Sequence, residues 1–316
     1  MQKLSERIEE IRFVRKIIFL AKKFTLPGFQ GVPIYNVVKL FFKAIDEGEI
    51  FQRAAAISYN FFVALFPGLL VAFTLIPYIP IDDFQERLMK IIEKALPDGT
   101  NDSVIEVINS IINIPHSGAL SLGFFLALFF STNGFKSIII AFNSSVLIHD
   151  DRSFLSLQWV SFVMSFVFAV TTVIAIITII ISEFFLSFLV DYGFIVQDVI
   201  YYLLLIGNWF IFVFMILFMV AFLYYLAPKA RAKFRLISPG SIVATIVIIL
   251  FMIVFNVYLE NFNKYNVLYG SIGTLLIVLL WIYVNAFILL LGFEINSSVF
   301  IAKNEENVHW IKNSSK

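Results

Sequence analysis

The sequence has no cysteine, only three histidines in 316 residues, and only 14% charged residues. Without cysteine the chain can form no disulfide framework, thiolate nucleophile or cysteine-ligated metal cluster. The histidines, His116, His149 and His309, are too scattered to show metal-ligand spacing. No glycine-rich loop followed by Lys and Ser or Thr is present, so the chain is not expected to bind ATP for transport. We therefore expect no enzyme activity, no metal and no cofactor.

Apolar residues are what the sequence has in excess. They make up 60% of the chain, whereas soluble domains average about 45–50%, and they gather in runs of about 20 or more, which suits a lipid bilayer. The formal net charge of +1 gives no indication of nucleic-acid binding. The sequence thus predicts an all-α, polytopic membrane protein.

Six apolar runs predict six transmembrane helices. They cover residues 56–79, 119–146, 155–183, 198–226, 237–260 and 270–300. Of the 23 Lys and Arg residues, 18 flank the spans on the side of the two termini and four on the other side. Because cytoplasmic loops carry an excess of Lys and Arg, both termini are expected in the cytoplasm.

The segments outside the spans also show helical patterns. Residues 1–50 are expected to form amphipathic helices on the cytoplasmic side, and residues 51–300 the membrane domain. Within that domain, residues 81–117 predict a helical hairpin between the first two spans, facing outward. Residues 301–316 are expected to be a cytoplasmic tail. Pro67, inside the first span, predicts a kinked helix packed within the bundle.

Lys136 is the strongest single signal for function, because it lies inside the second span. It is about ten residues, or about 15 Å, from the predicted cytoplasmic end. A Lys at the centre of a span costs about 2.5–3.5 kcal/mol on insertion scales, so it should face a partner or a wet cavity. Thr132 and Asn143 share its helical face, and Asn133 flanks it. The alternative is that the span ends early and Lys136 marks the membrane interface.

The last span carries a polar stripe. Thr274, Trp281, Asn285, Gly292 and Asn296 follow one another at spacings of 7, 4, 7 and 4, which places them on one face of a helix. Such a stripe fits either close packing between helices or the wall of a substrate path.

Charged and polar residues at the ends of two spans are further candidates. Glu294 lies on the side of the last span opposite the stripe, where interfacial water or an ion pair could satisfy it. Arg53 opens the first span together with Tyr59. Arg53 fits a topology anchor first, and a contact with anionic lipid headgroups second.

Four stretches of the sequence resemble the YihY/BrkB family of bacterial inner-membrane proteins. They are RAAAISYNFFVALFPGLL (53–70), FKSIIIAFN (135–143), YYLAPKARAKFRLISPGSIVA (224–244) and YNVLYGSIGTLLIVLLWIYVNAFILLLGFEIN (265–296). The resemblance covers most of residues 50–300 and implies a six-span protein of the bacterial inner membrane tied to the cell envelope. Members of the family have been labelled virulence factor and ribonuclease BN. The scattered histidines give the ribonuclease label no support, because a metal-dependent nuclease needs clustered ligands.

These observations lead to two hypotheses of different classes. The first is a non-ATPase transporter or flippase-like protein for a lipid or envelope precursor, with Lys136 neutralising an anionic headgroup. The second is a structural protein that scaffolds envelope machinery through the outer hairpin and the basic loop 229–235. Membrane lipids are the expected partners, with envelope proteins as further candidates and no nucleic acid. The sequence leaves the oligomeric state open.

Overall fold

The structure, a computed structural model, describes residues 19–78, 85–86, 89, 117–145, 152–191, 199–228, 235–260 and 263–314. All regular secondary structure in these ranges is helical. This agrees with the predicted all-α class.

Six long helices dominate the fold. They are α4 (Ile50–Leu75), α7 (Ser117–Asn143), α8 (Phe154–Asp191), α9 (Val199–Leu226), α10 (Pro239–Glu260) and α11 (Asn263–Ser314). Each provides a stretch of 21 to 30 residues that is long and apolar enough to cross a membrane, and in α4 this stretch continues through the short 3-10 helix η1 (Ile76–Tyr78). The prediction of six candidate spans is therefore confirmed. Helix α11 continues well past the predicted end of the last span and includes most of the expected tail.

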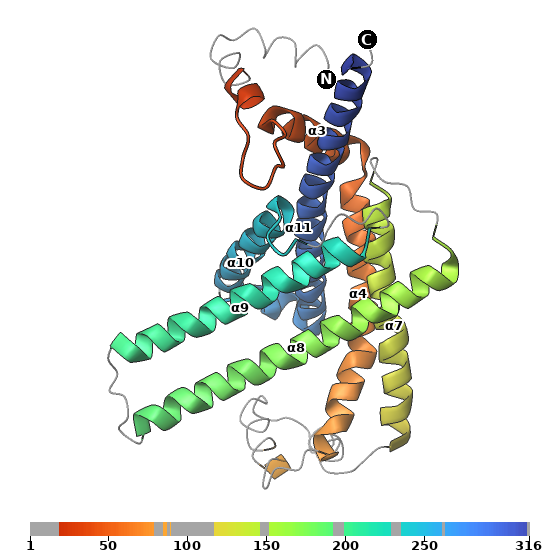
Figure 1. The fold of residues 1–316 in the computed structure, drawn as a ribbon. Helices are drawn as coiled ribbons and strands as arrows, with labels where there is room; N and C mark the ends of the chain where they lie inside the picture. The colour runs from red at the N-terminus through yellow and green to blue at the C-terminus, as the bar shows by residue number, and fades with distance from the viewer. Residues whose placement is uncertain are drawn as a thin grey trace.

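The helices form a closed circuit in chain order. Helix α4 packs on α7, α7 on α8, α8 on α9, α9 on α10 and α10 on α11, and α11 closes the circuit by packing on α4. In Figure 1, α4 and α7 run side by side, whereas α8 and α9 slant away from them as a pair. Because successive spans are antiparallel, one end of the bundle holds the starts of α4, α8 and α10 and the ends of α7 and α9. We call it the terminal end, since the C-terminal part of α11 projects from it.

The main core lies toward the terminal end. Residues of α4, α7 and α11, such as Ala54, Phe142 and Leu290, pack there with Met164 of α8. Many other large apolar side chains on the long helices are exposed. Such exposure fits lipid as the surrounding solvent, because lipid tails are as apolar as these side chains.

A short helix and a loop brace the terminal end. Helix α3 (Ile34–Glu47) is amphipathic, and it packs on α11 through Val37, which clusters with Val32, Val299 and Ala302. The loop before α3 has positive φ angles at Gly28, Gln30 and Gly31. Glycine adopts such angles without a steric penalty. Near α10, a Cβ added to Gly28 would lie 3.2 Å from the ring of Pro239.

Two expectations fall on residues outside the described ranges, and a third concerns Pro67. Residues 1–18 of the N-terminal amphipathic segment are not described, nor is the hairpin at 81–117 apart from isolated positions. Helix α4 passes through Pro67 without a break in its assignment. Phe66 and Leu69 beside Pro67 are about half exposed, at 52% and 50%. Pro67 itself is partly buried, and Leu70 and Val71 in this half of α4 lie against Gly123 of α7, so the helix packs in the bundle while it turns other large apolar side chains outward. The kink stays a prediction.

Candidate functional site

A buried ion pair joins the first and last spans. Arg53 Nη2 lies 2.8 Å from Glu294 Oε1, and the two side chains are 8% and 0% exposed. Arg53 is in the first turn of α4, and Glu294 is on α11. An ion pair withdrawn from solvent in this way is costly to desolvate unless further hydrogen bonds complete it.

The end of α7 supplies those further bonds. Arg53 Nη1 donates to Ala141 O at 2.7 Å, and Ser145 Oγ donates to Glu294 Oε2 at 2.8 Å. Ala141 O is one of the last carbonyls of α7, where a cation also complements the helix dipole. Gly48 lies beside the guanidinium, since a Cβ there would come 2.8 Å from Arg53 Nη2. The charged cluster thus fastens α4, α7 and α11 together at the terminal end.

The next contacts fasten α10 to α11. Gly240 and Gly292 face each other, and a Cβ on either one would collide with backbone atoms of the other. Asn296 Oδ1 accepts from Gly240 N at 2.8 Å, and Asn296 Nδ2 donates to Ser238 Oγ at 2.9 Å. The amide side chain of α11 therefore satisfies one of the free N–H groups at the start of α10.

An aromatic cluster adds α9. Tyr224 Oη donates to Leu289 O at 2.7 Å. The rings of Phe142 and Phe293 stack with centroids 4.1 Å apart and planes 4° apart, and Tyr224 packs against both. Residues 292–296 of α11 therefore contact α4, α7, α9 and α10 within little more than one turn.

The structure separates the remaining candidates into different surroundings. Asn143 is buried and donates to Ile139 O and, at 3.4 Å, to Ala227 O. Asn285 donates to Trp281 O of its own helix. Tyr59 is 65% exposed.

Thr132 lies at an open apolar groove between α7 and α8, and Lys136 lies one helical turn beyond it. The groove has a volume of about 730 Å³. Its lining residues are Phe125, Leu126, Leu128, Phe129, Thr132, Leu155, Gln158, Trp159 and Phe162. Lys136 Nζ lies 4.5 Å from the centroid of the Phe154 ring, at the first residue of α8. Lys136 is not among the lining residues. It follows Thr132 by one helical turn and therefore lies just beyond the terminal end of the groove.

Of the candidate residues on α7, Thr132 lines this groove, whereas Asn133 and Asn143 do not. Thr132 donates to Leu128 O at 2.7 Å. Asn133 is partly buried and is not among the groove's lining residues, and Asn143 packs toward the end of α9. The predicted face of α7 is thus divided between the groove and the helix core.

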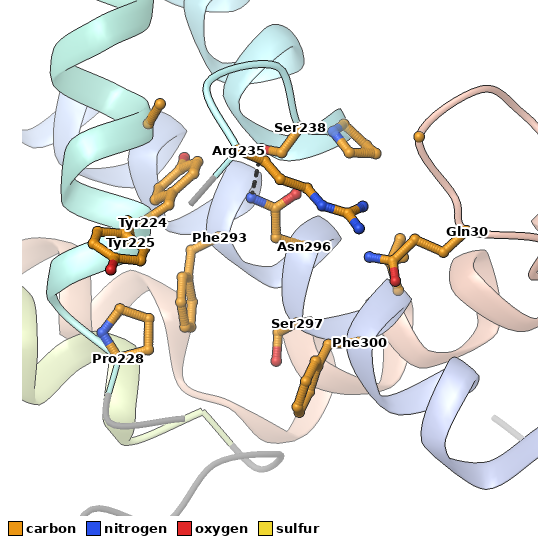
Figure 2. A pocket seen from close by; sticks show the side chains of 14 residues that line it. Gln30, Tyr224, Tyr225, Pro228, Arg235, Ser238, Phe293, Asn296, Ser297 and Phe300 are labelled. Atoms are coloured by element: carbon orange, nitrogen blue, oxygen red, sulfur yellow. Dashed lines mark hydrogen bonds between the residues drawn. The ribbon is translucent and has the colours of Figure 1, made fainter. Parts of the chain in front are cut away.

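A second, smaller pocket of about 100 Å³ lies at the terminal end (Figure 2). Its walls come from α9, the segment before α10, α11 and the loop before α3. The labelled side chains are Gln30, Tyr224, Tyr225, Pro228, Arg235, Ser238, Phe293, Asn296, Ser297 and Phe300. Arg235 extends over the pocket toward Asn296 and Gln30 in this view.

Sequence reasoning singled out Arg53 and Glu294 separately and did not pair them. It assigned no individual role to Ser145, Tyr224 or Gly240. The signal for Gly240 was present, because Ser238-Pro239-Gly240 marks a helix start that needs a partner for its free N–H groups. Ser145 and Tyr224 gave no signal, because nothing in their local pattern indicates the distant groups they bond. Among the described residues, no group of three His, Asp or Glu side chains could hold a metal ion.

Relatives of the chain are membrane proteins or carry a ribonuclease-like name. The chain is 26% identical over 254 residues to the ribonuclease-like protein YfkH of Bacillus subtilis (strain 168), which covers 80% of this chain and 90% of YfkH. It is 25% identical over 269 residues to a UPF0761 membrane protein of Coxiella burnetii (strain Dugway 5J108-111), covering 82% and 91% of the two chains. A UPF0761 membrane protein of Pseudoalteromonas translucida (strain TAC 125) is 34% identical over 77 residues, or 24% of this chain and 26% of the relative. No solved structure matches significantly.

The family assignment rests on a longer match than any of these alignments. The model of the virulence factor BrkB family matches residues 41–316, which include all six candidate spans and both partners of the buried ion pair. The chain is a membrane protein and belongs to the virulence factor BrkB family.

Proposed function

We propose that this protein moves a lipid or a lipid-linked envelope precursor across the bacterial inner membrane without ATP. The observation that carries the proposal is the open groove between α7 and α8, with a cation at one end of it. No catalytic step is assigned to the chain.

The chemistry of the groove suits an amphipathic substrate. Its walls are mostly large apolar side chains that would contact acyl chains, and Trp159 and Phe129 are 66% and 57% exposed. Gln158 adds a polar group for a passing headgroup, whereas the hydroxyl of Thr132 is buried and bonded to Leu128 O. Lys136 at the end of the groove would neutralise a phosphate, and at other times its ammonium rests on an aromatic ring, a contact worth about 0.5–1 kcal/mol at exposed sites.

The direction of the groove follows from the proposed orientation. The excess of Lys and Arg on the terminal side favours a cytoplasmic location for both termini. Lys136 would then stand at the level of the cytoplasmic leaflet, and the groove would lead outward from it. Anionic lipids of that leaflet would meet the cation first.

The second candidate function is a scaffold for envelope proteins. It is favoured by the contacts at the terminal end, where residues 292–296 fasten α11 to four other helices. Helices held together at one end could bind other proteins on a fixed surface, and they could equally support the moving parts of a transporter. A stoichiometric envelope partner found by crosslinking in intact membranes would favour this function.

A lipid-transfer assay tests the leading proposal. The purified protein is reconstituted into vesicles that contain a fluorescent phosphatidylglycerol, and dithionite added outside bleaches only the outer leaflet. Transfer would let the bleaching proceed well beyond half of the fluorescence. We expect Lys136→Ala and Gln158→Leu to slow it, and Lys39→Ala, an exposed position on α3, to leave it unchanged.

The outcomes separate the two functions. Equal rates of lipid transfer for the wild type and Lys136→Ala would show that Lys136 takes no part in the transfer. No transfer of phosphatidylglycerol or of a polyprenyl-phosphate analogue by well-folded protein would overturn the transport proposal and leave the scaffold.

A further inference from the structure

We propose that the pocket at the terminal end binds a phosphate group through Arg235, Ser297 and Gln30, three of its lining residues. This site is separate from the α7–α8 groove and does not depend on the proposed function. Its ligand would be a phosphate monoester or diester, carried either by a lipid headgroup or by a soluble molecule.

Arg235 provides the charge for such a site. Its guanidinium extends over the pocket (Figure 2). No hydrogen bond or ion pair joins it to any residue that the structure describes. A guanidinium offers five N–H donors in a planar fork that matches a phosphate. Because the guanidinium of Arg235 bonds none of the described residues, its donors are available for a ligand.

Ser297 is an independent sign of a ligand. Its side chain is 4% exposed, lines the pocket, and its Oγ has no hydrogen-bond partner among the described residues. Serine in a helix commonly bonds the carbonyl one turn earlier, as Ser161 does with Leu157 O. A buried hydroxyl left unpaired costs free energy, so an unpaired one in the lining of a pocket is a sign of a missing partner.

Gln30 supplies a third donor of fixed orientation. Its Oε1 accepts from Lys303 Nζ at 3.0 Å, which turns the amide nitrogen toward the pocket (Figure 2). The backbone of Gln30 has a φ of +55°, a region that non-glycine residues rarely adopt. Such strain is commonly kept at binding sites, where the surrounding structure holds it.

The charges around the pocket also favour an anion. None of the 14 lining residues is an Asp or Glu. The polar groups of Asn296 and Ser238 already bond each other, Gly240 and Ser241. These two side chains therefore line the pocket without being assigned a bond to the ligand. The pocket lies at the start of α10, where the helix dipole is positive.

The test uses the full-length protein in neutral detergent and two probes. Inorganic phosphate is titrated by calorimetry at constant ionic strength, and dihexanoyl phosphatidic acid is titrated in the same way. The variants are Arg235→Gln and Ser297→Ala, with Lys39→Gln, an exposed basic residue on α3, as the matched control. Size-exclusion chromatography and thermal melting establish that each variant is folded.

The expected result is binding by the wild type and by Lys39→Gln. We expect an affinity about 10- to 100-fold weaker in Arg235→Gln, the range for a lost charged hydrogen bond, and a smaller loss in Ser297→Ala. Binding of both probes supports a general phosphate site, binding of only the lipid assigns the phosphate to a headgroup, and binding of only inorganic phosphate assigns it to a soluble molecule. The proposal is overturned if neither probe binds, or if Arg235→Gln and Lys39→Gln bind as the wild type does.

Discussion

Breaking the ion pair between Arg53 and Glu294 should destabilise the protein strongly. Arg53→Met removes one partner and leaves a carboxylate that is 0% exposed without its cation. Removing one member of a buried pair costs about 3–5 kcal/mol, because the remaining charge stays buried and uncompensated. Ser145 Oγ would still donate to Glu294, but one neutral donor replaces only part of the lost interaction.

The magnitude can be expressed as a melting temperature. About 1 kcal/mol shifts the melting point of a domain of 150–250 residues by about 2–4 °C. For this larger chain a loss of about 3–5 kcal/mol corresponds to a drop on the order of 5–10 °C. The four tryptophans allow the transition to be followed by intrinsic fluorescence in detergent micelles.

A double variant distinguishes the ion pair from general damage to the packing. Arg53→Met combined with Glu294→Leu removes both charges, and apolar replacements for a buried pair are often neutral or stabilising. The double variant should therefore melt above Arg53→Met alone. Lys43→Met is the control, since Lys43 and Glu47 form an exposed pair at 3.9 Å that should contribute no measurable stability.

Two results would refute this reasoning. If Arg53→Met melted like the wild type, the ion pair would not stabilise the terminal end. If the double variant melted at or below Arg53→Met, the loss would come from the shape of the side chains and not from an uncompensated charge.

Three further substitutions test the contacts of α11, each measured by the same melting assay. Gly292→Ala should lower the melting temperature because the added Cβ collides with Gly240. The control Gly68→Ala, whose Cβ meets nothing within 4 Å, should be neutral or stabilising. Equal effects of the two variants would refute the close approach of α10 and α11. Tyr224→Phe should cost about 1 kcal/mol, the usual net value of one hydrogen bond, and an unchanged melting point would show that its bond contributes nothing. Asn296→Leu should cost more than Tyr224→Phe, because it leaves the N–H of Gly240 unpaired at the start of α10; the reverse order would contradict the role of the amide.

Much of the architecture could be predicted because it depends on local pattern. A span is recognised from the length and polarity of one segment, so all six spans were found from the sequence. The ends of the helices differ from the prediction. Helix α4 begins at Ile50, six residues before the predicted start of the first span, and α11 continues to Ser314. Turns and tails next to a span can remain helical when other parts of the chain pack on them, as α3 does on α11.

The candidate site was only half predictable. Arg53 and Glu294 were each recognised as unusual, because a charge at the end of a span needs a partner or water. Their pairing was not visible, since 241 residues separate them and no local pattern links the two positions. The same holds for Tyr224 and Leu289 O, since a hydroxyl and a backbone carbonyl leave no signal in composition or periodicity.

The sequence by itself determined that this is a six-span helical membrane protein, because hydrophobic length and helical periodicity are properties of single segments. The lack of cysteine also excludes a thiol nucleophile and a disulfide. Only the tertiary structure decided how the polar residues inside the membrane domain are used. It placed Glu294 on Arg53, Asn296 on the start of α10, and Lys136 at the end of an open groove. The physical reason is that a buried polar group must find its partner in space, and the closing of the circuit by α4 and α11 brings those partners together.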